Sequence, residues 1–408
     1  MNVSIIIPCR NNIKYFLQAY NSIRKYYPEV EIVALDDAST DDTWKILNEL
    51  YDKDKDLTLY RNDSQERVGH TVLYDIGIQN ATKDIVTILH SDMVVTQNYL
   101  ENMLKHIQKG VVVSGTRIEP PLHPPGLEKH VIDFGWEPQD LKESELSDAV
   151  DRLQQEYKDQ TTQGIFAPWM TYKEDFVSIG GHDKLFAPME LEDSDIFNRM
   201  LLAGYNFIQS RDAFVYHMTC RGSRFKDGLE IERVIDLPDG TKWYKPKDSE
   251  EYTKLRQNKF REWWRKWGTD VLHDQLMMPI VGKRYDIGYV IKNANYPVLN
   301  FLEPWSTSVY VDNKELLESY FNQEQPQTLY DLSSRVFHID KEPTSDIIIE
   351  LDALQLTNER ASFITKTSDI LGQLEEPGEY EYDIFKIRVR NHQPKELKPP
   401  FVTIKNIF

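Results

Sequence analysis

The sequence predicts an α/β protein whose mostly parallel sheet is flanked by helices, with a second, smaller α/β domain after it. Through the first half of the chain, short apolar runs rich in β-branched residues alternate with segments whose apolar residues recur at helical spacing. Such alternation requires crossover connections, which give a parallel sheet. Polar residues follow three of the apolar runs, at residues 10–12, 36–37 and 90–92. Because ligands bind beyond the carboxyl ends of parallel strands, we expect a ligand site where these residues meet.

Each expected element has a local signal for its limits. Residues 3–7 are largely apolar and β-branched, as in a buried strand, and Pro8 ends the run. Residues 15–27 have apolar side chains at helical spacing and are followed by Pro28. Further strands are expected at residues 31–35, 57–61, 84–89, 111–114 and 214–217, and further helices at residues 72–79, 144–159, 190–202 and 254–272, with one more starting near residue 43.

Length and charge limit the classes of function. The 408 residues predict two domains or three, at about 100–200 residues each. The chain has 66 acidic residues against 48 lysines and arginines, which gives a formal net charge of −18. This excess argues against a dedicated nucleic-acid binder and against attraction to anionic lipid through bulk charge. A phosphate-containing ligand is compatible with it, provided that positive charge offsets the phosphate locally.

Cysteine use and hydropathy predict a soluble cytoplasmic protein. Cys9 and Cys220 are far apart, so we expect neither a disulfide framework nor a zinc cluster, and a reducing compartment is the default. No apolar run reaches the roughly 20 residues that span a bilayer. The first residues lack the basic and long apolar regions of a signal peptide.

Several motifs of the first half, taken in order, resemble one enzyme family. Residues 3–12 (VSIIIPCRNN) and 32–43 (IVALDDASTDDT) resemble the opening of family 2 glycosyltransferases with the GT-A fold. The resemblance covers about residues 1–220, and the order of the motifs is more specific than any one of them. It continues through Gly69 and Gly77, residues 84–92, the Gly-Gly-His-Asp run at 180–183 and Glu192-Asp193.

The resemblance implies an inverting, metal-dependent enzyme of hexosyltransferase type. Such an enzyme moves a sugar from a nucleotide-diphosphate sugar, most commonly a UDP-sugar, to an acceptor hydroxyl, and its cofactor is Mn²⁺ or Mg²⁺. No motif identifies the acceptor, which could be a glycan, a lipid-linked molecule or a protein. We divide the chain into a GT-A domain at residues 1–230, a helical extension or linker at 231–281 and a C-terminal α/β domain at 282–408.

The nucleotide is expected beside the Asp-Asp pair that follows the second strand. The resemblance implies that Asp36 and Asp37 accept hydrogen bonds from a base imino group or a ribose hydroxyl. Alternatively, both carboxylates only cap the following helix. The resemblance also places Pro8, Arg10, Asn11, Gly69, His90 and Ser91 among the contacts to the nucleotide-sugar.

The metal is expected where the family has its Asp-x-Asp motif. The corresponding residues are His90, Ser91 and Asp92, and Asp92 can supply an oxygen ligand to a hard divalent ion. His90 replaces the first acid, but it could hydrogen-bond a ribose hydroxyl or ligate Mn²⁺. The resemblance implies that His217 completes the metal shell, although it could equally be a satisfied histidine at a strand end.

The resemblance makes Asp193 the general base that takes the proton from the acceptor hydroxyl. Acidic neighbours such as Glu190, Glu192 and Asp195 would raise its pKa by like-charge repulsion. The alternative is that these acids only favour the positive end of a helix dipole.

Further residues are expected around the donor and acceptor. Arg221 and Arg224, with Lys226 nearby, could close over the diphosphate as a lid, or could form a solvated charge run. Trp169 and Met170 precede the Gly-Gly run and are expected at the core or the pocket wall. Gly181 and Glu192 are expected to border the same pocket.

The remainder of the chain holds two features. Aromatic residues at helical spacing near residues 260–267 predict either a packing stripe or a helix at a membrane interface, which would allow peripheral membrane contact. Residues 286–292, 308–313 and 345–352 repeat, in order, an opening strand and two strands that end in an acid. We interpret them as a shortened, non-catalytic second copy of the nucleotide-binding half.

Two rival functions remain open at this point. A nucleotidyltransferase would require a glycine-rich loop after the first strand, and residues 8–12 contain no glycine. A catalytically inactive carbohydrate-binding or structural protein is favoured slightly by His90, which stands in place of an acid, and by the large extra domain.

Overall fold

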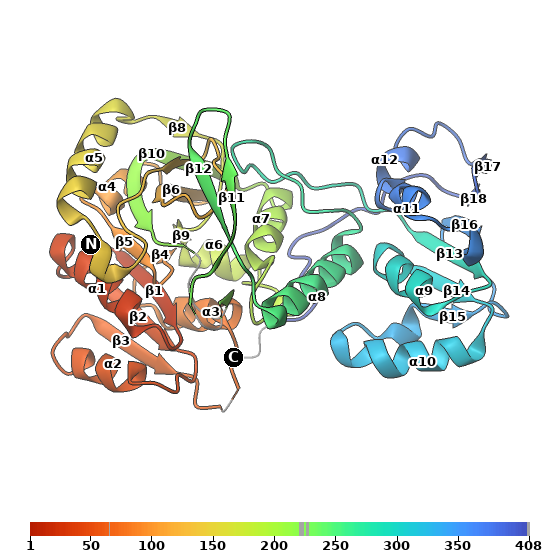
Figure 1. Ribbon diagram of the computed structural model, residues 1–408, viewed down its shortest axis with the longest axis horizontal. Helices are drawn as coiled ribbons and strands as arrows, with labels where there is room; N and C mark the ends of the chain where they lie inside the picture. The colour runs from red at the N-terminus through yellow and green to blue at the C-terminus, as the bar shows by residue number, and fades with distance from the viewer. Residues whose placement is uncertain (65, 220–223, 226–227, 406–408) are drawn as a thin grey trace. The chain divides into compact units, whose positions relative to one another are not determined.

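The computed structural model describes residues 1–64, 66–219, 224–225 and 228–405. The chain forms two compact units (Figure 1). The first unit comprises residues 1–254, 273–279 and 399–408, and the second comprises residues 255–272 and 280–398.

The first unit is built on one large mixed sheet. Its strands lie side by side in the order β3-β2-β1-β4-β9-β6-β10-β5 (Figure 1). The four strands at the β3 end are parallel, β9 is antiparallel to both of its neighbours, and β5 is antiparallel to β10. The strands are β1 (Val3–Cys9), β2 (Glu31–Asp36), β3 (Leu57–Arg61), β4 (Ile85–Ile88), β5 (Met93–Val95), β6 (Val111–Glu119), β9 (Trp169–Tyr172) and β10 (Asn206–His217), with β7 (Lys129–Val131) on β6 and β8 (Thr161–Thr162) on β10.

Helices cover this sheet, and the close approach of one of them requires a glycine. Every residue of β1 and β2 is buried, as expected for central parallel strands. A Cβ atom at Gly77 would lie 2.3 Å from Cγ2 of Ile6, so helix α3 can pack this closely on β1 only without a side chain there. The helices are α1 (Ile13–Tyr26), α2 (Thr43–Tyr51), α3 (His70–Asn80), α4 (Tyr99–Leu104), α5 (Glu143–Glu156), α6 (Lys173–Ser178) and α7 (Glu192–Leu202), with 3₁₀ turns η1 (Pro138–Asp140) and η2 (Lys184–Phe186).

The segment between the expected domains differs from the predicted helical extension. Residues 231–246 form a hairpin of β11 (Ile231–Asp236) and β12 (Lys242–Pro246), which belongs to the first unit. Helix α8 (Glu250–Trp267) follows, and from residue 255 onward it belongs to the second unit.

The tryptophans of α8 are packing residues. Trp263 and Trp267 are each 1% exposed, and Trp264 stacks on Trp305 with ring centroids 4.6 Å apart. The packing alternative therefore describes this helix, because its aromatic rings are not presented to a membrane surface. Within the described part of the chain, no helix is both long enough and apolar enough to cross a bilayer.

The second unit has its own sheet, in the order β15-β14-β13-β16-β18-β17. The first four strands are parallel, and β18 and β17 are antiparallel. The expected α/β architecture is thus confirmed for both units. The elements are β13 (Ile287–Lys292), α9 (Tyr296–Leu302), η4 (Glu303–Trp305), β14 (Ser308–Val311), α10 (Lys314–Glu324), η5 (Gln325–Gln327), η6 (Leu332–Ser334), β15 (Val336–His338), β16 (Ile347–Asp352), η7 (Ala353–Gln355), α11 (Asn358–Thr365), α12 (Thr367–Leu371), β17 (Gly378–Tyr382) and β18 (Phe385–Val389).

The two sheets share a strand order. In each sheet, the first strand in sequence lies between the second and the fourth, and an antiparallel strand follows the fourth. The orders are β3-β2-β1-β4-β9 in one sheet and β15-β14-β13-β16-β18 in the other. An asparagine with positive φ follows the first strand in both, at Asn11 (49°) and Asn293 (50°). Another asparagine then precedes the first helix, at Asn12 and Asn295.

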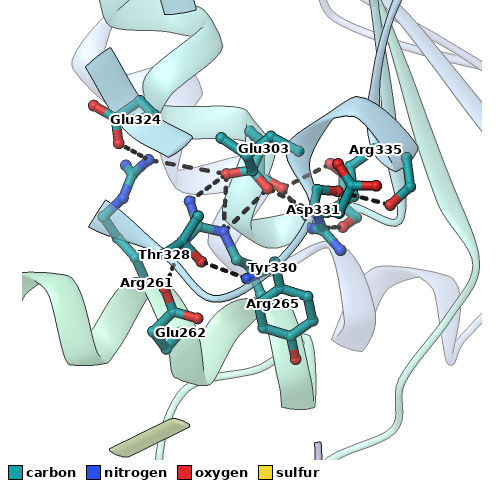
Figure 2. A network of polar contacts seen from close by, with 12 residues as sticks. Arg261, Glu262, Arg265, Glu303, Glu324, Thr328, Tyr330, Asp331 and Arg335 are labelled. Carbon is teal, nitrogen blue, oxygen red and sulfur yellow. Dashed lines mark hydrogen bonds and ion pairs between the residues drawn. The ribbon is translucent and has the colours of Figure 1, made fainter. Parts of the chain in front are cut away.

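A buried charge network holds the second unit together (Figure 2). Glu303 is fully buried and accepts hydrogen bonds from Arg265 (2.6 Å), Arg335 (2.7 Å) and the Tyr320 hydroxyl (3.2 Å). Burial by itself would raise the pKa of Glu303, but Arg265 and Arg335 lower it to about 2. One carboxylate therefore connects α8, α10 and the start of β15.

Candidate active site

A cavity of about 1140 Å³ lies at the carboxyl ends of the central strands of the first unit. Loops after β1, β2 and β4, the start of α7 and the end of β10 contribute to its wall. The predicted site residues that line it are Pro8, Arg10, Asp37, Gly69, His90, Ser91, Asp92, Glu192, Asp193, His217 and Arg224.

The remaining predicted site residues lie elsewhere. Asp36 is fully buried and accepts hydrogen bonds from the amide of Ser39 in the loop that follows β2. It does not cap α2, whose N-cap is Asp42. Asn11 donates to Thr40 and accepts from its amide, so it joins two loops behind the cavity wall. Trp169 and Met170 are fully buried in β9, as core residues and not as pocket wall. Arg221, together with Lys226 and Cys220, falls outside the described residues.

Gly181 has a packing role beneath the site. Its φ is +66°, and a Cβ atom there would lie 2.3 Å from Oδ2 of Asp75. Asp75 is buried, accepts the amide of His182 and lies 2.6 Å from Nδ1 of the same histidine. Asp75 therefore anchors the Gly-Gly-His-Asp loop at residues 180–183.

His90, Asp92 and His217 form a compact group of potential metal ligands. One ligand atom from each lies within 4.8 Å of the others. His90 and Asp92 follow β4, whereas His217 ends β10. The short strand β5 pairs Met93 with His217, and this pairing brings Asp92 and His217, which are 125 positions apart, to one point. Two imidazoles and a carboxylate are a mixed nitrogen and oxygen donor set, which fits a divalent transition ion.

His217 is oriented by Glu119, a carboxylate that belongs to none of the motifs in the sequence. Its Nδ1 lies 2.9 Å from Oε1 of Glu119, and its Nε2 lies 3.4 Å from Oδ1 of Asp92. Burial would lower the pKa of His217, but Asp92 and Glu119 raise it to about 9. Glu119 itself is 2% exposed and pairs with Arg117 and Lys129. A carboxylate behind a histidine fixes the ring and its tautomer.

Asp193 faces the same cavity from the start of α7. Glu190 and Leu191, just before the helix, have φ values of +82° and +67°, a costly conformation that turns the chain sharply into α7. Burial and the adjacent Glu192 raise the pKa of Asp193 to about 6. A carboxyl with this pKa can take a proton near neutral pH, as a general base requires.

Glu192 has a specific partner that the sequence did not reveal. His70 Nε2 lies 2.7 Å from Oε1 of Glu192, across a separation of 122 residues. Burial would raise the pKa of Glu192, but His70 lowers it overall, and Glu192 raises the pKa of His70 against its own burial. Glu192 is therefore the ionised member of the Glu-Asp pair, and its charge acts on Asp193.

Asp37 organises the end of the cavity that is formed by the loops after β1 and β2. Its carboxylate accepts hydrogen bonds from the amides of Val68 (2.8 Å) and Gly69 (2.9 Å) and from the Asn62 side chain (2.9 Å). Arg10 donates to the Asp37 carbonyl from the neighbouring loop. Arg67, on the loop that Asp37 holds, also lines the cavity. Positive charge is thus present beside the acidic rim.

Residues 4–147 match the model of Glycosyl transferase family 2. Residues 4–147 are a family 2 glycosyltransferase domain. The glycosyltransferase domain contains Asp37, Asp92 and Glu119, whereas Asp193 and His217 lie beyond the matched residues.

Relatives and solved structures resemble parts of the chain. An uncharacterized glycosyltransferase of Haemophilus influenzae is 31% identical over 112 residues, which are 27% of this chain and 44% of the relative. Glycosyltransferase GlyG of Streptococcus pneumoniae is 27% identical over 108 residues, or 26% of this chain and 35% of GlyG. The chain thus aligns with less than half the length of these curated relatives.

Among solved structures, GalNAc-T7 with UDP, GalNAc and Mn²⁺ gives a TM-score of 0.42 at 17% identity, over 53% of this chain and 44% of that one. The mannosyltransferase PcManGT of Pyrobaculum calidifontis, in complex with GDP-Man and Mn²⁺, gives a TM-score of 0.39 at 21% identity, over 55% of this chain and 59% of that one.

Proposed function

We propose that this protein is an inverting, metal-dependent glycosyltransferase that uses a nucleotide-diphosphate sugar. The observation that carries the proposal is a single cavity that joins the family 2 domain's strand ends, the His90–Asp92–His217 group and Asp193. The family 2 match of residues 4–147 supports glycosyl transfer as the reaction class. Hexosyl transfer from a UDP-sugar is the specific form that we expect.

A divalent cation would be held by His90, Asp92 and His217. The donor atoms lie close enough together to share one ion, and imidazole nitrogens favour Mn²⁺ over Mg²⁺. When bound, the ion supplies positive charge to the departing diphosphate. Glu119 would keep the His217 ring aimed at Asp92.

Asp193 would activate the acceptor. Its carboxylate takes the proton of the acceptor hydroxyl while the hydroxyl oxygen bonds to the anomeric carbon. The bond from that carbon to the diphosphate oxygen breaks on the opposite face, so the anomeric configuration inverts. Glu192 stays ionised through His70 and keeps Asp193 basic enough for this step.

The donor would lie along the loops after β1 and β2. Asp37 fixes the loop that carries Arg67 and Gly69, and Arg10 extends from the opposite loop. Arg10 and Arg67 both line this part of the wall, and guanidinium groups match phosphate oxygens. Arg224, which is paired with Asp248 at 2.5 Å, lines the cavity farther along.

Thermal shift measurements with a panel of nucleotide-sugars, each with and without Mn²⁺, test this proposal. We expect one donor class to raise the melting temperature in the presence of Mn²⁺ and to lose that effect in Asp92→Ala. A chain that no nucleotide-sugar stabilises with Mn²⁺ would contradict the proposed function. Stabilisation by a free glycan alone would favour the inactive carbohydrate-binding alternative.

A further inference from the structure

Residues 180–191 form a loop that leads directly into the proposed catalytic residues. Gly180 and Gly181 have positive φ at its start, which glycine adopts freely, and Glu190 and Leu191 have positive φ at its end, which is strained for residues with a side chain. Strained backbone of this kind persists only where surrounding contacts hold it. Because α7 begins at Glu192, the position of this loop determines where Asp193 points.

The end of the loop near Asp193 is held by the start of α3. The Thr71 hydroxyl donates to the carbonyl of Pro188 at 3.2 Å. A Cβ atom at Gly69 would lie 1.9 Å from the same carbonyl oxygen, so the two backbones are in direct contact. This contact lies within the first unit and involves residues of the cavity wall.

The start of the loop is held by the last described residues of the sequence. Asp183 is fully buried, and its carboxylate accepts the amides of Thr403 (2.7 Å) and Ile404 (2.9 Å). The Lys184 amide returns a hydrogen bond to the Ile404 carbonyl at 3.0 Å. A buried carboxylate with two backbone donors makes strong, directional, charge-assisted bonds.

Packing continues this contact along the loop. A Cβ atom at Gly180 would lie 3.0 Å from Val402 and 3.6 Å from Pro400, so the segment covers the glycine closely. Asp183 is also the N-cap of η2 and accepts the Leu185 amide at 3.1 Å. The same carboxylate therefore binds the segment and shapes the loop.

We propose that residues 399–405 are a positioning element of the transfer reaction, fixing Asp183 and, through the loop, the placement of Asp193. This inference rests on the proposed role of Asp193. The chain returns to the first unit with this segment after it has formed residues 280–398, so the second unit precedes the contact in sequence. The donor contacts at Arg10, Asp37 and Asp92 lie on other loops, so turnover depends on the segment more than donor binding does.

Two variants of Thr403, one to proline and one to alanine, test the inference in the full chain. Thr403→Pro removes the amide that Asp183 accepts, whereas Thr403→Ala keeps it. Hydrogen–deuterium exchange of the amides at residues 184–191 reports the loop position without reference to activity. Steady-state kinetics with Mn²⁺ and the donor identified in the panel give kcat and the donor KM. A chain that ends at Lys398, with and without a synthetic peptide of residues 399–408, is the second test.

We expect Thr403→Pro and the shortened chain to exchange faster at residues 184–191 and to lose at least about tenfold in kcat, because small misplacements of catalytic groups are costly. The donor KM should change less than about threefold by the same reasoning. Thr403→Ala should keep wild-type protection, and the peptide should restore protection to the shortened chain. Unchanged protection in Thr403→Pro and in the shortened chain would overturn the inference. Faster exchange with unchanged kcat would show that the segment holds the loop but does not position Asp193, and would also overturn the inference. A wild type without transfer activity would refute only the proposed function.

Discussion

At the scale of single residues, the site depends on pairs that bring distant positions together. Asp193 and Asp92 could be selected from the sequence because each lies in a recognisable motif next to an element boundary. Glu119 and His70 could not, because their partners His217 and Glu192 are 98 and 122 residues away. Trp169 could be expected at the core or the pocket wall, and the structure places it in the core, a choice that the local sequence leaves open.

The pKa of Asp193 predicts a pH profile. Because burial and Glu192 raise it to about 6, the basic form is lost below that pH. The rate should therefore fall about tenfold per pH unit below about 6 and be level above it. A profile of kcat/KM against pH between 4.5 and 8 checks this, because kcat/KM reports the pKa of the free enzyme, and a rate that stays level down to pH 4.5 would contradict it.

The same shift predicts that Asp193 destabilises the folded protein when ionised. The folded-state pKa lies above the usual value of 3.8. The loss of folding stability caused by the Asp193 charge is therefore absent well below pH 4 and fully present above about pH 6. Asp193→Asn should therefore raise the melting temperature at pH 7.5 while it abolishes turnover. Thermal unfolding of wild type and variant from pH 4 to 8 measures the difference in melting temperature at both ends of this range. A variant that is less stable than wild type at pH 7.5 would refute this prediction.

Glu119 should control metal affinity through His217. Glu119→Gln should weaken Mn²⁺ binding by about 10- to 100-fold, the usual effect of removing an orienting carboxylate. Glu174→Gln is the matched control, since Glu174 is an exposed partner of Lys109. Calorimetric titration of Mn²⁺ compares the two variants, and equal affinities would show that Glu119 does not orient a ligand.

At the scale of elements, the sequence was sufficient for long strands and helices and failed for short ones. The central strands are apolar and β-branched, α1 and α2 have clear helical periodicity, and proline or polar residues limit them. Strand β5, three residues long, carries no pattern of its own, yet it brings His217 to Asp92. The β11–β12 hairpin was missed although Asp239-Gly240 between two alternating runs is a hairpin signal.

Gly77 offers a test of the packing of α3 on the sheet. An alanine in a helix interior normally gains about 1 kcal/mol over glycine. Here its Cβ would meet Ile6 at 2.3 Å and Leu35 at 2.9 Å, and overpacking costs typically 1–3 kcal/mol. Gly77→Ala should therefore lower the free energy of unfolding, measured in urea, whereas Asn80→Ala at the exposed helix end should not. A more stable Gly77→Ala variant would show that Ile6 and Leu35 can move to accommodate the added methyl group.

At the scale of the whole molecule, we propose that the second unit is a shortened second copy of the nucleotide-binding half. The shared strand order and the asparagines after the first strands support this origin. Sequence order alone suggested the repeat, but the antiparallel fifth strand in both sheets could not be anticipated, because β9 and β18 differ in composition and in their distance along the chain.

Glu303 should be the most sensitive residue of the second unit. Glu303→Gln removes the buried anion that Arg335 and Arg265 share and leaves Arg265 with Glu262 alone (2.9 Å), which costs about 3–5 kcal/mol. Because its pKa is lowered to about 2, its contribution is present above about pH 4.5 and is lost as the pH falls toward 2. Urea unfolding of this variant against Glu379→Gln, an exposed partner of Arg388, checks the effect. Equal stability of the two would contradict the assigned role.

The central claim is that one cavity combines a metal group with Asp193 as the catalytic base, and this also explains how a chain of net charge −18 can handle a diphosphate. The most direct measurement is Mn²⁺-dependent release of nucleoside diphosphate from the bound donor by wild type, Asp193→Ala and Asp92→Ala. The account predicts release by wild type, a loss of about 100-fold or more in Asp193→Ala with donor binding retained, and loss of Mn²⁺ dependence in Asp92→Ala. Equal rates in all three proteins would contradict it.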